Sequence, residues 1–149
     1  MEIIKITDID LLVRMRFDFF AAIGHPDGNN KNEIESSFRE YLQRNAGNTF
    51  IAIAVKEKEE IVSAGFLTIN EIPANNAAPN GLSGTLLNIL TYASYRGRGY
   101  GKILIEAIKE EARNRNLSFI DLYATDQGVD LYKKCGFLPI SYQAMRLKL

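Results

Sequence analysis

The sequence predicts a single α/β domain with a mixed sheet, and three observations lead to this fold class. The chain has 149 residues, which is the size of one domain (1–149) and enough to bury a core. β-rich apolar runs alternate along it with stretches whose apolar residues recur at helical spacing. The strand-like residues 85–93 lead through a glycine-rich turn into a helix and then into a strand at 118–124. Such a β-loop-α-β unit favours a parallel crossover.

The N-terminal half is expected to hold two helices followed by a hairpin. Residues 2–6 predict a strand, and Thr7 or Asp8 then supplies the N-cap of a helix. The turn-forming residues 24–30 end that helix. The next elements are a helix at 32–45, a strand at 49–55, a charged turn at 56–60 and an antiparallel strand at 61–72.

The C-terminal half continues from a long loop, residues 73–84, which is rich in Asn, Pro, Gly and Ala. After the central unit we expect a short helix at 126–135, ended by Gly136, and two final strands at 137–142 and 143–149. The expected order is therefore β-α-α-β-β-β-α-β-α-β-β.

Composition excludes several functional classes. The chain carries 18 basic and 18 acidic side chains, and this balance argues against a general nucleic-acid binder. Cys135 is the single cysteine, so no internal disulfide can form and a reducing cytoplasm is the expected compartment. No apolar run approaches membrane-spanning length, and the first residues do not resemble a signal peptide. We therefore expect a cytoplasmic protein without a membrane or nucleic-acid partner.

The turn between residues 96 and 101 predicts an anion site. It holds three glycines in five residues, which let a ligand approach the backbone closely. The following helix begins with unpartnered amides and the positive end of its dipole, which together favour phosphate. The residues predicted to bind it are Arg96, Gly97, Arg98, Gly99, Tyr100, Gly101 and Lys102.

Spacing separates this turn from two other phosphate loops. A dinucleotide fingerprint needs glycine where Lys102 stands. A nucleoside-triphosphate loop needs glycine at the position of Arg96 and Ser or Thr at that of Ile103. The remaining pattern, R-x-x-G-x-G, resembles the acyl-CoA pyrophosphate loop of the GCN5-related N-acetyltransferases (GNAT family). A plain glycine-rich turn with solvated arginines is the alternative interpretation.

The resemblance to this family extends over the predicted element order and is strongest from about residue 87 to 137. It implies a mixed sheet splayed between its fourth and fifth strands, with acetyl-CoA as cosubstrate entering the gap. The implied reaction is acetyl transfer to a primary amine of a small molecule or peptide by direct attack.

The segment L-Y-x-x-x-G-F at residues 131–137 is the second signature, and its resemblance implies that Tyr132 faces the CoA sulfur. A positioned acid that protonates the departing thiolate assists such a transfer. A tyrosine pKa near 10 against about 8.5 for a thiol makes the proton transfer uphill by only about 2 kcal/mol. The alternative role for Tyr132 is packing beside Phe137.

The resemblance also assigns roles on the fourth strand and after the fifth. It implies that the Leu90 amide polarises the thioester carbonyl and that Tyr92 hydrogen-bonds the pantetheine arm. Strand alternation places Asn88 on the same face, where it could line the acceptor pocket. The chain departs from the family at Ala93, where many members have proline, and at Thr125, where many have a cofactor-binding asparagine. The Thr125 hydroxyl could replace part of that contact.

The general base is the least constrained role. Glu71 ends the third predicted strand and could reach the cleft, although a solvated strand-end glutamate fits equally well. His25 lies in a turn, and Cys135 is expected to be a buried spacer. No His/Cys cluster indicates a metal.

Two other functions stay open beside the enzyme: a non-catalytic acyl-CoA-binding sensor and an interaction domain that binds no nucleotide. The acceptor pocket is expected to be built from the first two helices, their connection at 24–31 and the loop at 73–84. A homodimer is possible, because the last strand could pair across a two-fold axis.

Overall fold

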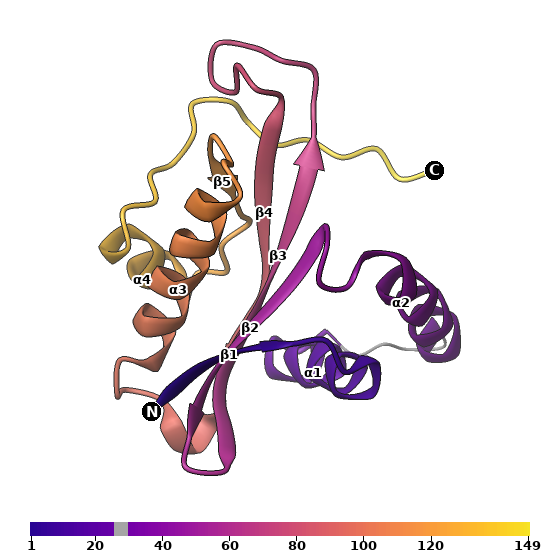
Figure 1. Ribbon diagram of the computed structural model, residues 1–149, viewed down its shortest axis with the longest axis vertical. Coiled ribbons are helices and arrows are strands. Elements are labelled where there is room, and N and C mark those ends of the chain that lie inside the picture. Colours follow the sequence, from indigo (N-terminus) through magenta and orange to yellow (C-terminus); the bar gives the residue numbers. More distant parts are fainter. Residues whose placement is uncertain (26–29) are drawn as a thin grey trace.

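The computed structural model describes residues 1–25 and 30–149, so most of the predicted turn at 24–30 lies outside the described residues (Figure 1). Its strands form one five-stranded sheet in the order β1-β2-β3-β4-β5. The strands are β1 (Glu2–Ile6), β2 (Phe50–Glu57), β3 (Glu60–Glu71), β4 (Leu82–Thr91) and β5 (Ile120–Asp121). The helices are α1 (Ile9–Ala22), α2 (Lys31–Asn45), the 3-10 helix η2 (Ala93–Tyr95), α3 (Tyr100–Asn114) and α4 (Val129–Lys134).

The pairing of the strands confirms the mixed α/β fold class. Strands β1 to β4 pair antiparallel, and β2 and β3 form the predicted hairpin. β5 then pairs parallel with β4 through two residue pairs, Gly84 with Ile120 and Thr85 with Asp121. Beyond Thr85 the two strands separate, so the sheet is splayed between its fourth and fifth strands, as the resemblance implies.

Helices cover both faces of the sheet, with α1 and α2 on one side and α3 on the other (Figure 1). Strand β2 contributes to the hydrophobic cores on both faces of the sheet, because successive side chains of a strand point to opposite faces. Phe50 and Ala52 pack with α1 and α2, whereas Ile51 and Ile53 pack with α3. β2 is consequently apolar at consecutive positions and not only at every second one. Asp8 is the N-cap of α1, because its Oδ1 accepts from the Leu11 amide at 2.7 Å.

The prediction of two final strands is wrong for this chain. Residues 135–149 are all described and contain no strand. A strand needs a neighbouring ladder, and β5 is only two residues long, so it offers the C-terminal segment little to pair with. The segment extends across the end of the sheet (Figure 1). Its exposed apolar side chains are Leu138, Ile140, Tyr142, Met145, Leu147 and Leu149.

Candidate active site

A bulge in β4 shapes the site. The register between β3 and β4 shifts between Ala64 and Phe66, and opposite this shift Asn88 has a φ of 59°. Asparagine tolerates this left-handed conformation better than most residues. Its buried side chain is held on both sides, because Nδ2 donates to the Met15 carbonyl at 3.2 Å and Oδ1 accepts from Arg16 Nη1 at 3.1 Å. The bulge thereby links β4 to α1.

The direction of the β4 amides differs from the sequence-based assignment. The Tyr92 amide donates to the Val62 carbonyl at 3.1 Å. Since amides alternate between the two sides of an extended strand, the Leu90 amide also points toward β3, where Ala64 lies opposite. The amides of Ile89 and Thr91 point to the splayed side. The register therefore argues against the Leu90 amide as the group that polarises a thioester.

The turn before α3 has the backbone geometry that the sequence predicts for an anion site. Gly97 and Gly99 have φ angles of 75° and 82°, which other residues adopt with strain. In the described part of the chain, no backbone carbonyl accepts from the amides of residues 97–102, and the first bonded amide is that of Ile103, which donates to Gly99. Gly99 caps α3 without any side-chain bond. These amides are therefore available to a ligand.

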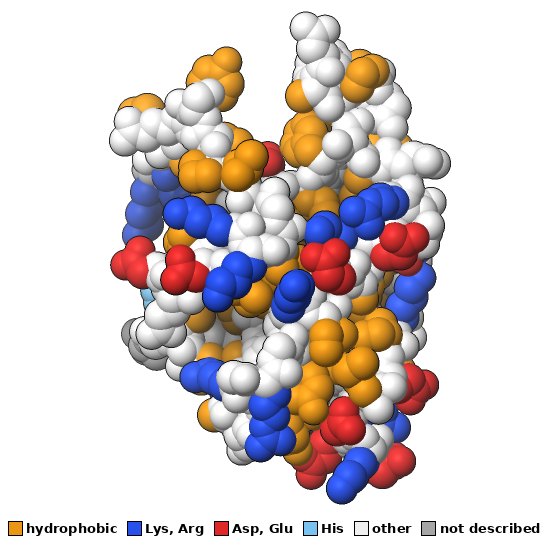
Figure 2. Space-filling model, turned by 90° about the vertical axis from the view of Figure 1, so that its left-hand side faces the viewer, with side chains coloured by type: hydrophobic (Ala, Val, Ile, Leu, Met, Phe, Trp, Pro, Cys, Tyr) orange, Lys and Arg blue, Asp and Glu red, His pale blue; other side chains and the backbone are white. Residues whose placement is uncertain are grey.

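The basic side chains around this turn reinforce its positive potential. Arg96, Arg98 and Lys102 are exposed, and none of them forms an ion pair with a described carboxylate. Arg96 Nε donates to the Thr91 carbonyl at 3.1 Å, which ties the turn to the end of β4. The Arg98 guanidinium lies 5.6 Å from the centre of the Tyr95 ring. Figure 2 shows Lys and Arg side chains across the α3 and α4 face, interspersed with acidic ones.

A cavity of about 510 Å³ opens beside the splay and brings most of these groups together. β4 contributes residues 86–91, the turn contributes Arg96, and the α4 region contributes Thr125, Gly128 and Tyr132. α1 and its C-cap residue form another wall through Arg16, Phe19, Phe20, Ala22 and Ile23. No carboxylate or imidazole of the described residues lines this cavity.

Tyr132 offers a free hydroxyl at this cavity. The residue is half-buried, and its hydroxyl forms no hydrogen bond within the described chain. Burial, assisted by the neighbouring Cys135, raises the pKa of the phenol, so it stays protonated at neutral pH. Its ring also packs edge-on against Phe137 at 5.8 Å, so the packing and the catalytic interpretations are compatible. Gly128 leaves room for the ring, since a Cβ there would lie 2.9 Å from Tyr132 Cε2.

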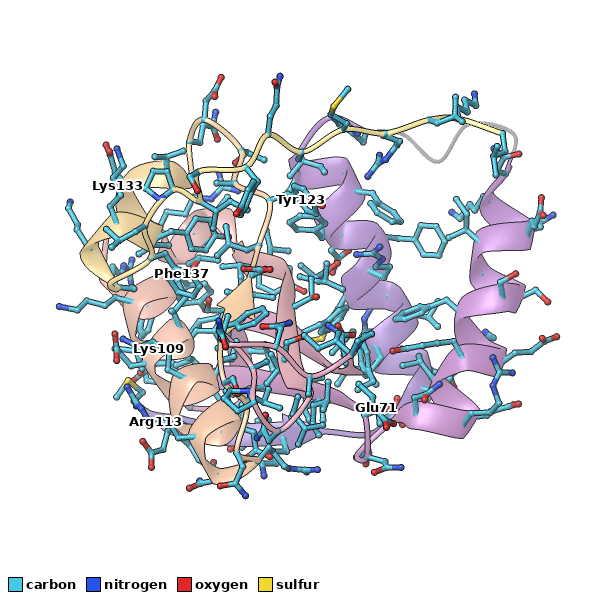
Figure 3. All side chains as sticks on the ribbon, turned by 90° about the horizontal axis from the view of Figure 1, so that it is seen from above. Glu71, Lys109, Arg113, Tyr123, Lys133 and Phe137 are labelled. Carbon is cyan, nitrogen blue, oxygen red and sulfur yellow. The ribbon has the colours of Figure 1, made fainter. Side chains whose placement is uncertain are left out.

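Tyr92 and Glu71 lie outside the cavity lining. The Tyr92 hydroxyl donates to Asp18 Oδ2 at 2.8 Å, and burial together with this bond raises the pKa of Tyr92 to about 12. The backbone amide and the hydroxyl of Tyr92 thus both donate to groups within the protein. Glu71 pairs with Leu82, which lies about 26 Å along the strand from Leu90. Figure 3 shows Glu71 well apart from Tyr123 and Phe137.

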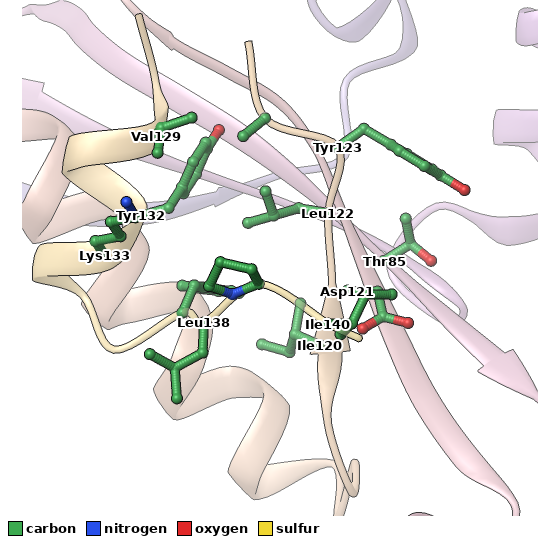
Figure 4. A pocket seen from close by; sticks show the side chains of 13 residues that line it. Thr85, Ile120, Asp121, Leu122, Tyr123, Val129, Tyr132, Lys133, Leu138 and Ile140 are labelled. Atoms are coloured by element: carbon green, nitrogen blue, oxygen red, sulfur yellow. The ribbon is translucent and has the colours of Figure 1, made fainter. Parts of the chain in front are cut away.

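A second cavity, also of about 510 Å³, borders β5 (Figure 4). Tyr123 and Tyr132 border both cavities. The wall of the second cavity comes largely from β5 with the residues that follow it, 120–124, and from residues 137–140 of the C-terminal segment. Cys135 is buried and unpaired, as expected for a spacer.

Residues 1–25 and 30–149 contain no group of three or more His, Cys, Asp or Glu side chains placed to hold a metal ion. None of the described helices is long and apolar enough to cross a membrane.

Comparison with known proteins identifies the family. The model of the acetyltransferase (GNAT) family matches residues 14–137. The chain belongs to the GNAT family. It is 29% identical over 93 residues to an uncharacterized N-acetyltransferase, ycf52, of Pyropia yezoensis, covering 61% of this chain and 49% of that protein. It is 31% identical over 64 residues to GCN5-related N-acetyltransferase 2, chloroplastic, of Arabidopsis thaliana, covering 43% of this chain and 25% of that protein. The matches thus span about half or less of these curated relatives.

Solved structures of this family match over nearly the whole chain. A GCN5-related N-acetyltransferase from Ralstonia eutropha JMP134 has a TM-score of 0.83 at 25% identity, covering 98% of this chain and 97% of that chain. A predicted acetyltransferase from Clostridium acetobutylicum, solved with acetyl-CoA, also has a TM-score of 0.83 at 25% identity, covering 99% and 95%. Glucosamine-6-phosphate N-acetyltransferase from Arabidopsis thaliana shares the fold, with a TM-score of 0.72 at 18% identity over 98% and 97%.

Proposed function

We propose that this protein transfers an acetyl group from acetyl-CoA to a primary amine of a small molecule or peptide by direct attack. The observation that carries the proposal is the convergence on one cavity of the open side of β4, the Arg96 end of the glycine-rich turn and the free Tyr132 hydroxyl. The family and the acetyl-CoA in the Clostridium acetobutylicum structure support the choice of cosubstrate.

The turn would hold the cosubstrate through its main chain. Free amides of residues 97–102 would donate to the diphosphate, and Arg96, Arg98 and Lys102 would add charge. Thr125, at the cavity wall, would bind through its hydroxyl. Gly99 is suited to this role because its φ of 82° turns the backbone into the first turn of α3 without strain.

Chemistry would take place where β4 and Tyr132 meet. Acetyl-CoA supplies an activated thioester, whose carbonyl oxygen gains negative charge when the amine attacks. In place of Leu90, we assign its stabilisation to the Ile89 and Thr91 amides, which point to the splayed side. The new C–N bond forms as the C–S bond breaks, and the Tyr132 phenol gives its proton to the departing sulfur.

The amine must lose a proton before or during attack. Because no described carboxylate or imidazole lines the cavity, we assign this proton to water, which in turn restores the Tyr132 phenol. Glu71 has no part in this scheme, since it lies outside the cavity lining. The cytoplasmic location stays a prediction.

The test is a panel of amines, amino acids and peptides incubated with acetyl-CoA, with thiol release as the readout. Release that depends on an acceptor supports the enzyme. Binding of acetyl-CoA in calorimetry without release for any acceptor would favour the non-catalytic sensor. Absence of binding heat would favour an interaction domain and contradict both.

The C-terminal segment supports a homodimer as a second proposal about assembly. Its exposed apolar residues alternate in two runs, 138, 140, 142 and 145, 147, 149, as in a strand with one buried face. Burying them on a second copy would contribute about 1.5–3 kcal/mol per side chain. We expect light scattering to show a dimer that Ile140→Lys with Leu147→Lys dissociates. Gln143→Lys, at an exposed polar position, is the control. A monomeric wild type at high concentration would contradict the dimer.

A further inference from the structure

Arg16 is a cation in the wall of the active-site cavity with no charged partner in the described chain. It is half-buried on α1, and its Nη1 donates to Asn88 Oδ1 at 3.1 Å. Its guanidinium carbon lies 4.5 Å from the centre of the Phe20 ring. Both partners are neutral. No described carboxylate lies within ion-pair distance of this side chain.

Two other arginines, Arg39 and Arg115, are paired with carboxylates. Arg39 Nη1 lies 2.6 Å from Asp10 Oδ1, and its Nε lies 3.0 Å from Glu35 Oε1. Arg115 Nε lies 3.0 Å from Glu111 Oε1. Arg16 differs because burial lowers its pKa and no nearby carboxylate offsets that effect. A partly desolvated charge without a counter-charge is unfavourable, so an anion brought by a ligand would be bound strongly.

The guanidinium is also held in place. Asn88 is 4% exposed, and its amide is fixed by the bond from Nδ2 to the Met15 carbonyl at 3.2 Å. Its oxygen is thereby directed at Arg16. Because a guanidinium has five N–H donors and the structure uses one of them on Asn88, several remain for a ligand.

The composition of the cavity favours one charge class of acceptor. Arg16 and Arg96 are the charged residues in its described lining, and the remaining α1 residues there, such as Phe19 and Phe20, are apolar. Nothing in that lining would pair with a second ammonium group. An acceptor with an anionic substituent would satisfy Arg16, whereas a polycationic amine would be repelled.

We propose, building on the acetyltransferase function above, that the acceptor is an amine that also carries a carboxylate or phosphate group, and that Arg16 binds this group. A planar guanidinium matches both anions through two parallel hydrogen bonds, which a lysine cannot reproduce. Arg16 is therefore the residue that determines acceptor specificity, while Asn88 positions it.

The experiment compares pairs of amines that differ only in the anion. One pair is an α-amino acid and its carboxamide, and the other is an aminoalkyl phosphate and the corresponding amino alcohol. In the wild type we expect kcat/KM, measured by thiol release, to favour the anionic member of at least one pair by about 10-fold or more. The pair with the larger ratio distinguishes carboxylate from phosphate.

Variants of Arg16 locate the effect. Arg16→Met should reduce the ratio to near one and Arg16→Lys should keep part of it, with the KM for acetyl-CoA unchanged. Arg16→Gln serves if the methionine variant fails to fold, as judged by thermal melting. Arg113→Met is the matched control, because Arg113 is an exposed arginine on α3, paired with Glu110 at 3.2 Å. It should retain the wild-type ratio.

Two results would overturn the inference: equal rates for both members of both pairs in the wild type, or a ratio that survives in Arg16→Met. If no amine is acetylated, the proposed function fails. Arg16 is then tested separately by an NMR titration that measures binding of the same pairs to the CoA-saturated protein. Tighter binding of the anionic member that Arg16→Met abolishes would support the anion site. Equal binding of both members would contradict it.

Discussion

The two sides of the active-site cavity are built in different ways. On the cofactor side, the groups expected to bind are main-chain amides from one short stretch, residues 97–102, together with side chains that flank it. On the acceptor side, the polar groups are side chains from distant parts of the chain, since Arg16 and Asn88 are 72 residues apart. Backbone recognition tolerates many side chains, whereas side-chain recognition depends on each residue. Under the proposed function, the cofactor side can therefore be shared by a family, whereas we expect the acceptor side to set the substrate.

Replacement of Tyr132 by Phe should have the largest effect. Without the phenol proton, thiolate departure is unassisted, so we expect kcat to fall by about 100-fold or more. The affinity for acetyl-CoA, measured by calorimetry, should stay within about twofold. Tyr142→Phe, at a side chain that is 85% exposed, is the control and should not alter kcat. A Tyr132→Phe enzyme with the wild-type rate would remove the acid role while leaving the family assignment intact.

Loss of Asn88 should affect the acceptor side alone. Asn88→Gly keeps the φ of 59° accessible but removes the partner of Arg16, so we expect the KM for the amine to rise by about 10-fold. Asn88→Ala should raise the KM for the amine by a similar factor. Its free energy of unfolding should also be about 1 kcal/mol lower than that of Asn88→Gly, because alanine is strained at this φ. Acetyl-CoA affinity should be unchanged in both. A matching loss of acetyl-CoA affinity would show that the two sides are not separable.

Gly99→Ala tests the cofactor side in the same way. A Cβ at Gly99 meets no atom within 4 Å, so the cost comes from its φ of 82° and from hindered approach to the amides. We expect the Kd for acetyl-CoA to rise by about 5–10-fold with kcat at saturation nearly unchanged. Gly47→Ala is matched in φ at 79° and lies outside the turn. Gly47→Ala should lower the free energy of unfolding by a similar amount without weakening the binding of acetyl-CoA. An equal loss of acetyl-CoA affinity in both variants would argue against the turn as the diphosphate site.

Tyr92→Phe should have the smallest effect. Its hydroxyl donates to Asp18, with the phenol pKa raised to about 12 by burial and by that bond, so it makes a structural link between β4 and α1. We expect at most about 1 kcal/mol of lost stability in denaturant unfolding and a Kd for acetyl-CoA within about twofold of the wild type. A tenfold weaker Kd would restore the pantetheine role that the sequence suggested for Tyr92.

Sequence reasoning was most accurate where a function depends on neighbouring residues. The glycines at 97 and 99 predict a turn with free amides, and the structure contains it. The β4 assignment to Leu90 differs by one residue from the amides that we propose, because the choice between adjacent amides depends on which one faces β3. Arg16 was missed altogether. Its position on α1 carries no motif, and the available signal was its helical spacing from Leu12, Val13 and Phe20 on the apolar face of the helix.

The sequence by itself determined the family, the mixed sheet and the glycine-rich turn with its free amides, because each of these follows from short-range patterns of glycine, charge and apolar spacing. Tertiary structure alone decided the direction of the β4 amides, the distance of Glu71 from the cavity and the meeting of Arg16 with Asn88. These depend on strand register and on a bulge, and a shift of one residue in register reverses the side to which a strand's groups point.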